Sequence, residues 1–443
     1  MRLKVKELLE AVSGTLLFGG IEKEFEFVSS NSKENIENRL FIPIVGQNKD
    51  GHDYIGDAVK NGAVGYLTQN DQVFPCGFGV KVSDTKKALG DLARYVRDKI
   101  NPTVIGITGS VGKTTTRQFI AGVVSQLGKT LVTVGNFNND IGLPLSILSA
   151  AGDEKFMVLE MGMNSLGEIS YLTQIAKPDI AVITLIGTSH IEYLGSRDNI
   201  LKAKLEILEG LKEEGKIVFN GDDPILYSLK EKYKPEYYGR NLEIISDKFV
   251  IDNQEYEIEP EGRHNKINAS SAVLIGKLLG ASYEQIKDGL KSFEQIKYRQ
   301  DIKALDGKTI ILDCYNASLD SDLAALAVLR EYKGKRKIAV LGGIGELGYH
   351  LEGILNQIGI GVFENNIDLL ICTDENSNYI KDGAIKAGMP SERIFYFETK
   401  EELYQEIDSI LKEGDTILIK ASRKYKFEEI YEFLKQDINK GML

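Results

Sequence analysis

The stretch Thr108-Gly109-Ser110-Val111-Gly112-Lys113-Thr114-Thr115 decides how the centre of this chain folds. It follows an apolar run at 104–107 that predicts a buried strand, and it precedes a segment at 117–124 that predicts a helix. Glycines in such a turn let backbone N–H groups surround phosphate oxygens, and the helix N-terminus adds partial positive charge. Lys113 is placed to contact the terminal phosphates, and the Thr114 hydroxyl is placed to bind Mg²⁺. The stretch therefore predicts a binding site for a nucleoside triphosphate such as ATP.

The composition predicts a large soluble enzyme. The 443 residues favour about three domains, and the 42% of hydrophobic residues can fill several cores. Lys and Arg number 54 against 65 Asp and Glu, so the net charge of −11 argues against a nucleic-acid partner. The three cysteines form no Cys-x-x-Cys pair, which is typical of the reducing cytoplasm. Because the sequence contains neither a signal-peptide core nor an apolar run of ~20 residues, we expect a cytoplasmic protein without a membrane span.

The chain divides into three predicted units, at 1–101, 102–300 and 301–443, with Asn101-Pro102 at the first boundary. The first unit combines short β-like runs with helices at 57–62 and 85–99. In the other two units apolar β-like runs alternate with helical patterns, which predicts an α/β fold with mostly parallel sheets. These runs lie at 157–159, 180–183, 216–219, 309–312, 338–341, 369–371 and 416–419, and those of the first unit at 40–44 and 65–67.

Two residues that follow predicted strands are candidate metal ligands. Glu160 comes directly after the run at 157–159, and His190 follows the run at 180–183 by a short loop. Ligands gather at the carboxyl ends of strands in open α/β sheets, and a carboxylate there can hold Mg²⁺. His190 has two possible interpretations, a metal ligand or a hydrogen-bonded structural histidine.

Lys204 lies at an unusual position for a lysine. The segment at 199–209 has helical periodicity, and Lys204 falls within its apolar stripe. Burial would lower the pKa of the amine, and a neutral amine can combine with CO₂ to form a carbamate, an anion able to hold a second Mg²⁺. The alternative is a lysine whose amine reaches the solvent along the helix surface.

These features together resemble the Mur ligase family, the ATP-dependent amide-bond ligases of peptidoglycan precursor synthesis. The phosphate loop resembles the family's Thr-Gly-[Ser/Thr]-x-Gly-Lys-[Thr/Ser] form, and the segment at 135–145 resembles its substrate-contact loop, in the form of the D-alanyl-D-alanine-adding members. Glu160, His190 and Lys204 correspond to the family's two metal ligands and its carbamylated lysine.

The resemblance also implies roles for residues elsewhere in the chain. Asn268 would approach the nucleotide, Arg299 would reach the γ-phosphate, Asp313 would contact the ribose, and Tyr315 and Asn316 would border the adenine. Substrate contacts would come from Ser30, Asn31, Ser32, Asn138, Asn139, Lys420, Ser422 and Arg423. The family's Asp-Ser-Arg segment reads Asn31-Ser32-Lys33 here, and lysine keeps the charge but cannot bind phosphate through two parallel hydrogen bonds.

The resemblance implies an ATP-dependent ligase with three domains: a UDP-sugar domain, a central P-loop domain and a Rossmann-like C-terminal domain for the incoming amino substrate. It would join UDP-MurNAc-tripeptide to D-Ala-D-Ala through an acyl phosphate, as a monomer. The implied cofactors are ATP and two Mg²⁺ ions. Thr114 and Glu160 would hold the first ion, and His190 and carbamylated Lys204 the second. Lys113, Lys204, His190 and Arg299 form the expected catalytic set.

Three alternatives remain at the level of the sequence. The first is a ligase of the same architecture that acts on a different, non-murein carboxylate. The second is a P-loop ATPase or kinase that needs no amine acceptor. The third is a nucleotide-binding regulatory module without catalysis, although binding alone would not require Glu160, His190 and Lys204 together.

Overall fold

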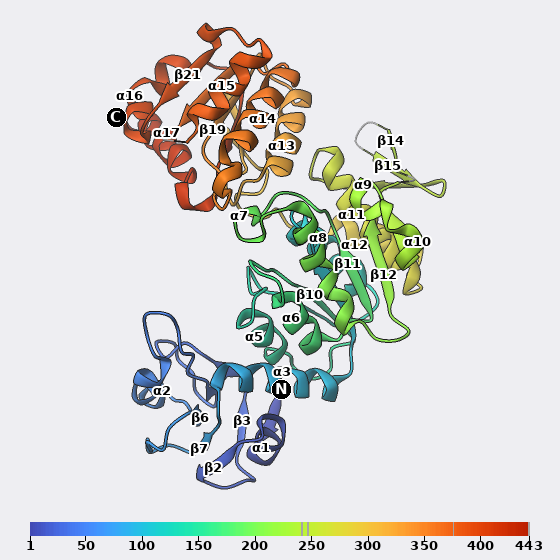
Figure 1. The fold of residues 1–443 in the computed structure, drawn as a ribbon, viewed down its shortest axis with the longest axis vertical. Coiled ribbons are helices and arrows are strands. Elements are labelled where there is room, and N and C mark those ends of the chain that lie inside the picture. Colours follow the sequence, from blue (N-terminus) through green and yellow to red (C-terminus); the bar gives the residue numbers. More distant parts are fainter. Residues whose placement is uncertain (241, 246–247, 375, 442–443) are drawn as a thin grey trace.

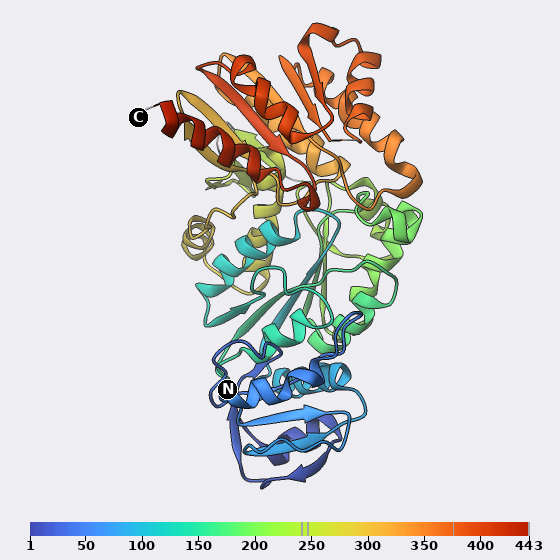
Figure 2. The ribbon, with the colours of Figure 1, turned by 90° about the vertical axis from the view of Figure 1, so that its left-hand side faces the viewer.

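A computed structural model describes residues 1–240, 242–245, 248–374 and 376–441. Three sheet-bearing units follow one another along the long axis of the molecule, with the N-terminal unit at one end and the C-terminal unit at the other (Figures 1 and 2). Within the described residues no helix is both long and apolar enough to cross a membrane.

The N-terminal unit is built on a mixed five-stranded sheet in the order β2-β7-β6-β5-β4. The predicted strand at 40–44 is shorter in the structure, where β5 covers only two residues. The elements are β1 (Arg2–Lys4), α1 (Val5–Val12), β2 (Thr15–Phe18), β3 (Glu24–Glu26), β4 (Val28–Ser29), β5 (Leu40–Phe41), the 3₁₀ helix η1 (Gly51–Tyr54), α2 (Ile55–Lys60), β6 (Gly65–Thr68), β7 (Phe78–Lys81) and α3 (Thr85–Ile100).

The middle unit contains a parallel six-stranded sheet in the order β13-β12-β11-β8-β10-β9. Its strands are β8 (Thr103–Thr108), β9 (Thr130–Val132), β10 (Phe156–Glu160), β11 (Ile180–Ile183), β12 (Lys216–Asn220) and β13 (Glu236–Tyr238). Its helices are α4 (Lys113–Ser125), α5 (Gly142–Leu148), α6 (Glu168–Ala176), α7 (Ile191–Leu194), α8 (Arg197–Leu205), the 3₁₀ helix η2 (Glu206–Gly210), α9 (Pro224–Ser228), α10 (Lys230–Tyr233), α11 (Arg263–Leu278) and α12 (Tyr283–Lys291).

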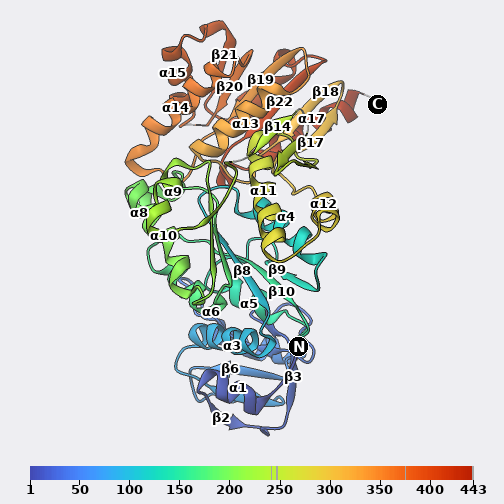
Figure 3. The same cartoon turned by 90° about the vertical axis from the view of Figure 1, so that its right-hand side faces the viewer.

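The helices of the middle unit cover both faces of its sheet. Helices α4, α11 and α12 lie together on one side, and α6, α8 and α10 lie on the other (Figure 3). The apolar side chains of α4, such as Phe119 and Val123, are buried in one cluster with Ile105 and Ile107 of β8. Alternate residues of a strand point to opposite faces, so β8 is apolar on both faces and sits at the centre of the sheet.

Two features of the middle unit differ from the sequence-based expectation. The predicted helix at 199–209 is α-helical only to Leu205 and continues as the 3₁₀ helix η2. An antiparallel meander of β14 (Glu243–Ile245), β15 (Lys248–Ile251) and β16 (Gln254–Glu257) was not predicted. Its second turn contains Asp252 and Asn253 with φ of 51° and 62°, which is the backbone of a type I′ hairpin turn.

The C-terminal unit contains a six-stranded sheet in the order β17-β18-β22-β19-β20-β21, in which only β17 is antiparallel to its neighbour. The predicted α/β class with mostly parallel sheets is confirmed. The strands are β17 (Asp301–Leu305), β18 (Lys308–Leu312), β19 (Arg336–Leu341), β20 (Leu369–Thr373), β21 (Ile394–Phe397) and β22 (Asp415–Lys420). The helices are α13 (Leu319–Glu331), α14 (Leu351–Glu364), α15 (Asn378–Ala387), α16 (Lys400–Ile410), α17 (Glu428–Gly441) and the 3₁₀ helices η3 (Gly348–His350), η4 (Ser391–Arg393) and η5 (Arg423–Tyr425).

Candidate active site

The phosphate loop joins the central strand β8 to helix α4, as the sequence predicts. Gly109 and Gly112 have φ of 146° and 86°, and a Cβ atom at Gly109 would lie 2.0 Å from Oγ1 of Thr184. Glycine is therefore required at this turn by both backbone conformation and space. The Lys113 amine folds back over the loop and donates to the carbonyl oxygens of Gly109 (2.7 Å) and Ser110 (3.3 Å).

Glu160 lies beside this loop because β10 pairs with β8 in parallel, with Glu160 opposite Ile107. The carboxylate is 3% exposed. Its Oε2 atom accepts from the Thr114 hydroxyl (3.1 Å), and its Oε1 atom accepts from the Asn138 amide (3.0 Å). Sequence reasoning missed Arg117, whose Nη1 atom is 3.5 Å from Glu160 Oε2. Its position four residues after Lys113 on one helix face was an available signal.

Lys204 is buried, with 1% of the residue exposed, so burial, the first of its two interpretations, holds and the amine does not reach the solvent. Among the residues that the structure describes, its amine has no hydrogen-bond partner. Burial and the nearby Lys113 ammonium lower the pKa of Lys204 well below its usual value, against the opposing effect of Glu160 and two further carboxylates. A buried amine without a partner is costly, and its neutral form is chemically reactive.

His190 lies on a loop that is attached to the phosphate loop. The Thr184 hydroxyl donates to the Val111 carbonyl (2.6 Å), and the Ser189 hydroxyl donates to the Ser110 carbonyl (3.3 Å). The Nδ1 atom of His190 is 2.6 Å from Oε2 of Glu346, a residue of the C-terminal unit. The proximity of His190 lowers the pKa of the Glu346 carboxyl, despite its partial burial.

A cavity of about 470 Å³ lies between the middle and C-terminal units. It gathers most of the residues predicted to contact the nucleotide. The predicted residues among its lining are Val111, Gly112, Thr115, Asn268, Arg299, Asp313, Tyr315, Asn316 and Lys420. The Thr108 hydroxyl instead donates to the Met161 carbonyl (2.8 Å), which ties the end of β8 to the segment after β10.

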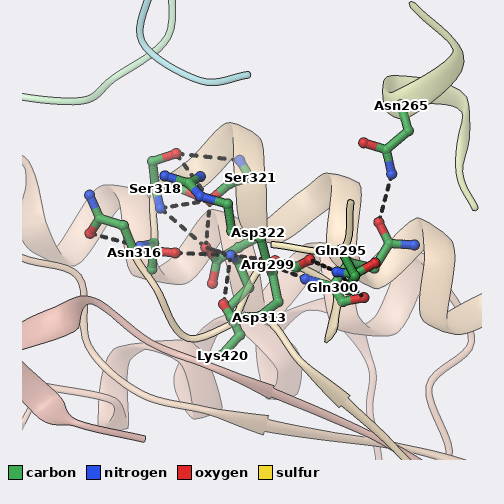
Figure 4. A network of polar contacts seen from close by, with 11 residues as sticks. Asn265, Gln295, Arg299, Gln300, Asp313, Asn316, Ser318, Ser321, Asp322 and Lys420 are labelled. Atoms are coloured by element: carbon green, nitrogen blue, oxygen red, sulfur yellow. Dashed lines mark hydrogen bonds and ion pairs between the residues drawn. The ribbon is translucent and has the colours of Figure 1, made fainter. Parts of the chain in front are cut away.

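Arg299 and Asp313 lie in a polar network along one wall of this cavity (Figure 4). The guanidinium of Arg299 lies 4.2 Å from the centre of the Tyr315 ring. Its Nε atom is buried and has no hydrogen-bond partner in the described part of the chain. Asp313 accepts from the backbone N–H of Gln300 (3.2 Å), which links β18 to the segment between the two units. A cation held on an aromatic face with a free donor is suited to meet an anionic group.

Lys420 has a different environment from the one expected for a substrate contact. It is 1% exposed, and its amine donates to the Asp313 carboxylate (2.7 Å) and to the Asn316 carbonyl (3.1 Å). Oδ2 of Asp322 is 3.9 Å away. Burial opposes the charge of Lys420, but Asp313 and Asp322 raise its pKa above the usual value. Burial raises the pKa of Asp322 to about 6.

The remaining predicted substrate residues lie in three places. Asn139 accepts from the backbone N–H of Gly142 (2.8 Å) at the start of α5. The Ser422 hydroxyl accepts from the Gly345 N–H (3.0 Å), and Arg423 donates to Glu428 (2.7 Å). Ser30, Asn31 and Ser32 belong to the N-terminal unit, which has its own hollow of about 190 Å³. Its lining consists of Ser32, Lys33, Tyr54, Asp57, Lys60 and Asn61.

A divalent ion at Glu160 would need several oxygen donors around it. Among the described residues, no group of three or more His, Cys, Asp or Glu side chains could hold a metal by itself. The site nevertheless offers the Glu160 carboxylate and the Thr114 hydroxyl, which are the oxygen ligands that Mg²⁺ prefers. The buried, unpartnered Lys204 amine would become a further oxygen donor on carbamylation. The residues present therefore fit Mg²⁺ provided that Lys204 is modified.

Comparison with known proteins identifies similar domains and similar full-length chains. Residues 107–276 match the Mur ligase middle domain, and residues 298–423 match the Mur ligase, glutamate ligase domain. The UDP-N-acetylmuramoyl-tripeptide–D-alanyl-D-alanine ligase of Bacillus subtilis (strain 168) is 36% identical over 97% of this chain and 98% of its own length. The ligase of the same name from Haemophilus influenzae is 30% identical over 99% of both chains.

Solved structures show the same architecture. A crystal structure of MurF from Acinetobacter baumannii matches 98% of this chain and 99% of its own, with a TM-score of 0.89 and 27% identity. MurF ligase from Thermotoga maritima in complex with ADP matches 94% of this chain and 98% of its own, with a TM-score of 0.82 and 27% identity.

Proposed function

Because this chain belongs to the Mur ligase family, we propose that it is the ligase that joins D-alanyl-D-alanine to a UDP-N-acetylmuramoyl-tripeptide with the hydrolysis of ATP. Relatives named for this reaction match the chain over nearly its full length. One arrangement carries the proposal: the phosphate loop with Lys113 and Thr114, facing Glu160, beside a buried lysine without a partner. ATP binding alone would not require that lysine.

ATP would lie in the cavity between the middle and C-terminal units. Its phosphates would meet the backbone N–H groups of 109–115 and the amine of Lys113, which would exchange its loop carbonyls for phosphate oxygens. The Arg299 side chain, with its free Nε donor, would approach the γ-phosphate from the domain junction. Asn268, Asp313, Tyr315 and Asn316 would hold the nucleoside portion.

Two Mg²⁺ ions would neutralise the repulsion between the ATP phosphates and the substrate carboxylate. Thr114 and Glu160 would hold the first ion. His190 and carbamylated Lys204 would hold the second. The lowered pKa of Lys204 supports the modification, since only the neutral amine reacts with CO₂.

The reaction would proceed in two steps. A carboxylate oxygen of the tripeptide attacks the γ-phosphorus, the bond to the β–γ bridging oxygen breaks, and ADP and an acyl phosphate form. The amine of D-Ala-D-Ala then attacks the acyl carbon, gives a tetrahedral intermediate, and expels phosphate as the amide forms. Lys113 and Arg299 would balance the negative charge that develops. Closure of the C-terminal unit over the cavity would exclude the water that hydrolyses an acyl phosphate.

The substrates would be shared among the three units, with boundaries at 101 and 300. Ser30, Asn31 and Ser32 would contact the UDP-sugar, and Asn138 and Asn139 would contact the peptide near Glu160. Ser422, Arg423 and, through its network with Asp313, Lys420 would serve the incoming dipeptide. We propose that the protein works as a monomer in the cytoplasm. Its three free cysteines support the reducing compartment.

Phosphate release in four reaction mixtures tests the proposal. ATP and Mg²⁺ are combined with neither substrate, with UDP-MurNAc-tripeptide alone, with D-Ala-D-Ala alone, and with both, and the products are identified by mass spectrometry. The proposal expects rapid release and a UDP-MurNAc-pentapeptide only when both substrates are present. Release in the absence of both substrates would instead identify an ATPase, and no reaction with this pair would indicate a ligase for another carboxylate.

A further inference from the structure

A close side-chain contact joins the predicted metal ligand His190 to the C-terminal unit. Oε2 of Glu346, on the loop that follows β19, lies 2.6 Å from Nδ1 of His190. Both residues have the left-handed backbone, with φ of 61° for Glu346 and 65° for His190. This conformation is costly for residues other than glycine and persists where the surroundings enforce it, often at functional sites.

The two units are also held together here by contacts that do not involve the Glu346 carboxylate. The Glu346 carbonyl accepts from the backbone N–H of Glu192 (3.1 Å). The Tyr349 hydroxyl donates to the Gly195 carbonyl (2.9 Å), and Oδ2 of Asp320 accepts from the backbone N–H of Thr188 (3.1 Å). The C-terminal unit therefore makes hydrogen bonds to residues before and after His190. The docking of the C-terminal unit on the middle unit does not depend on the Glu346 side chain.

The Glu346 carboxylate adds little to stability as an ion pair. Its side chain is 42% exposed, and solvent screens the attraction in such a pair. The geometry is better explained by orientation of the imidazole ring. The contact does not have hydrogen-bond geometry in this arrangement, and Nδ1 of His190 has no hydrogen-bond partner among the described residues. A small turn of the ring would let Nδ1–H donate to the adjacent carboxylate, and the Nε2 atom would then remain for a second partner.

We infer that Glu346 is a positioning residue that fixes the His190 ring for metal binding and makes the metal site complete only when the C-terminal unit is docked. A histidine that binds a metal through one ring nitrogen commonly donates its other N–H to a carboxylate, which sets both tautomer and ring orientation. This inference rests on the proposed function, since it takes His190 as a ligand of the second Mg²⁺. It explains how domain closure and metal binding are coupled: the orienting carboxylate comes from the unit that must close.

The test is a Mn²⁺ titration followed by electron paramagnetic resonance, with AMP-PNP bound to the full-length protein. We expect wild type to bind two Mn²⁺ ions and Glu346→Ala to bind the second about 10- to 100-fold more weakly. Glu346→Gln, which keeps an acceptor for Nδ1–H, should lie between them. Tyr349→Phe is the matched control, because it removes a docking hydrogen bond without touching His190, and should leave Mn²⁺ affinity unchanged.

Two results would overturn the inference. Equal affinity of Glu346→Ala and wild type for the second ion, while His190→Ala loses it, would remove Glu346 alone and leave the proposed function in place. A wild-type protein that ligates its substrates, and whose Mn²⁺ binding is unchanged in His190→Ala, would show that His190 is no metal ligand and would exclude the role of Glu346 with it. Small-angle scattering of each variant checks that the units keep their arrangement, and a kcat that falls in Glu346→Ala at unchanged KM for D-Ala-D-Ala supports the positioning role.

Discussion

Two lysines of this protein are equally buried and yet opposite in chemistry. Lys204 on α8 and Lys420 at the end of β22 are each 1% exposed. Within the described ranges the Lys204 amine has no hydrogen-bond partner, and burial lowers its pKa well below the usual value. The Lys420 amine is held by the Asp313 carboxylate and two carbonyl oxygens, and its pKa is raised despite burial.

The difference shows that burial alone does not define the role of a charged residue. A buried ammonium that is fully paired remains charged and fixes the groups around it. A buried amine that is left unpaired loses its proton and becomes available for chemistry. In this molecule Lys420 ties Asp313 in place within the nucleotide cavity, and Lys204 is the group prepared for modification.

The largest expected effect is on stability, at Lys420. Lys420→Met removes the partner of Asp313 and of the fully buried Asp322, and breaking a buried pair in this way costs about 3–5 kcal/mol. Urea unfolding measures the loss. The control is Lys81→Met, whose ion pair with Asp71 has the same 2.7 Å distance but is exposed, and it should cost about 0–1 kcal/mol. Equal losses in the two variants would show that the Lys420 network carries no special weight.

The same substitution at Lys204 is expected to reverse the pattern. Lys204→Met replaces an unpaired buried amine by an apolar chain of similar length, so the free energy of unfolding should be unchanged or higher. Ligase turnover should fall by about 10²–10³-fold, as for the loss of one group that stabilises transition-state charge. Lys202→Met on the exposed side of α8 is the control and should keep full activity.

Partial rescue of Lys204→Ala by acetate would support the carbamate, and near-normal turnover of Lys204→Met would remove the lysine from the mechanism.

The pH dependence of stability separates the two lysines with a smaller effect. The pKa of Lys204 in the folded protein lies below 10.5, the usual value that applies in the unfolded chain. Between the folded-state and the unfolded-state pKa the unfolded chain binds one proton more, so the free energy of unfolding rises with pH. The slope is at most about 1.4 kcal/mol per pH unit. Because the pKa of Lys420 is raised, its contribution is complete below 10.5 and flat in this range.

Unfolding from pH 7 to 9.5 in CO₂-free buffer measures this slope. The rise in unfolding free energy with pH that comes from the Lys204 amine should be absent in Lys204→Met. It should be retained in Lys420→Met. An identical slope in wild type and Lys204→Met would mean that Lys204 is charged in the folded protein.

The sequence placed Lys204 in an apolar stripe, with a solvent-reaching amine as the alternative, but it showed no sign of the environment of Lys420. The reason is the range of the interactions. The apolar stripe of one helix shows that Lys204 faces the core. The partners of Lys420 are Asp313, directly after β18, and Asp322 on α13, about a hundred residues away. Only the strand order β18-β22 brings them together. The contact between His190 and Glu346 crosses two units and leaves no local pattern.

Local sequence signals predicted most of the fold. One further element, the meander β14–β16, was missed although its turn carries such a signal. The alternation of apolar runs and helical patterns indicated the parallel sheets, since strands buried on both faces read as continuous apolar runs. The hairpin signal is Asp252-Asn253 in the meander. Its strands β14 and β15 contain only short apolar runs, and β16 consists mostly of polar residues, so the three strands do not stand out as a repeated apolar pattern. The end of α8 at Leu205 depends on packing of η2 against α6, which the sequence does not show.

An exposed lysine completes the comparison with the smallest expected effect. Lys33 lies in the hollow of the N-terminal unit, where neither burial nor a tight partner fixes its geometry. Lys33→Arg offers a diphosphate two parallel hydrogen bonds in place of one. We expect the KM for UDP-MurNAc-tripeptide to fall two- to five-fold, or about 0.5–1 kcal/mol, at unchanged kcat and stability. Lys60→Arg in the same hollow, whose amine lies 3.5 Å from Asp57, should leave KM unchanged, and a rise in KM for Lys33→Arg would show that Lys33 does not face the diphosphate.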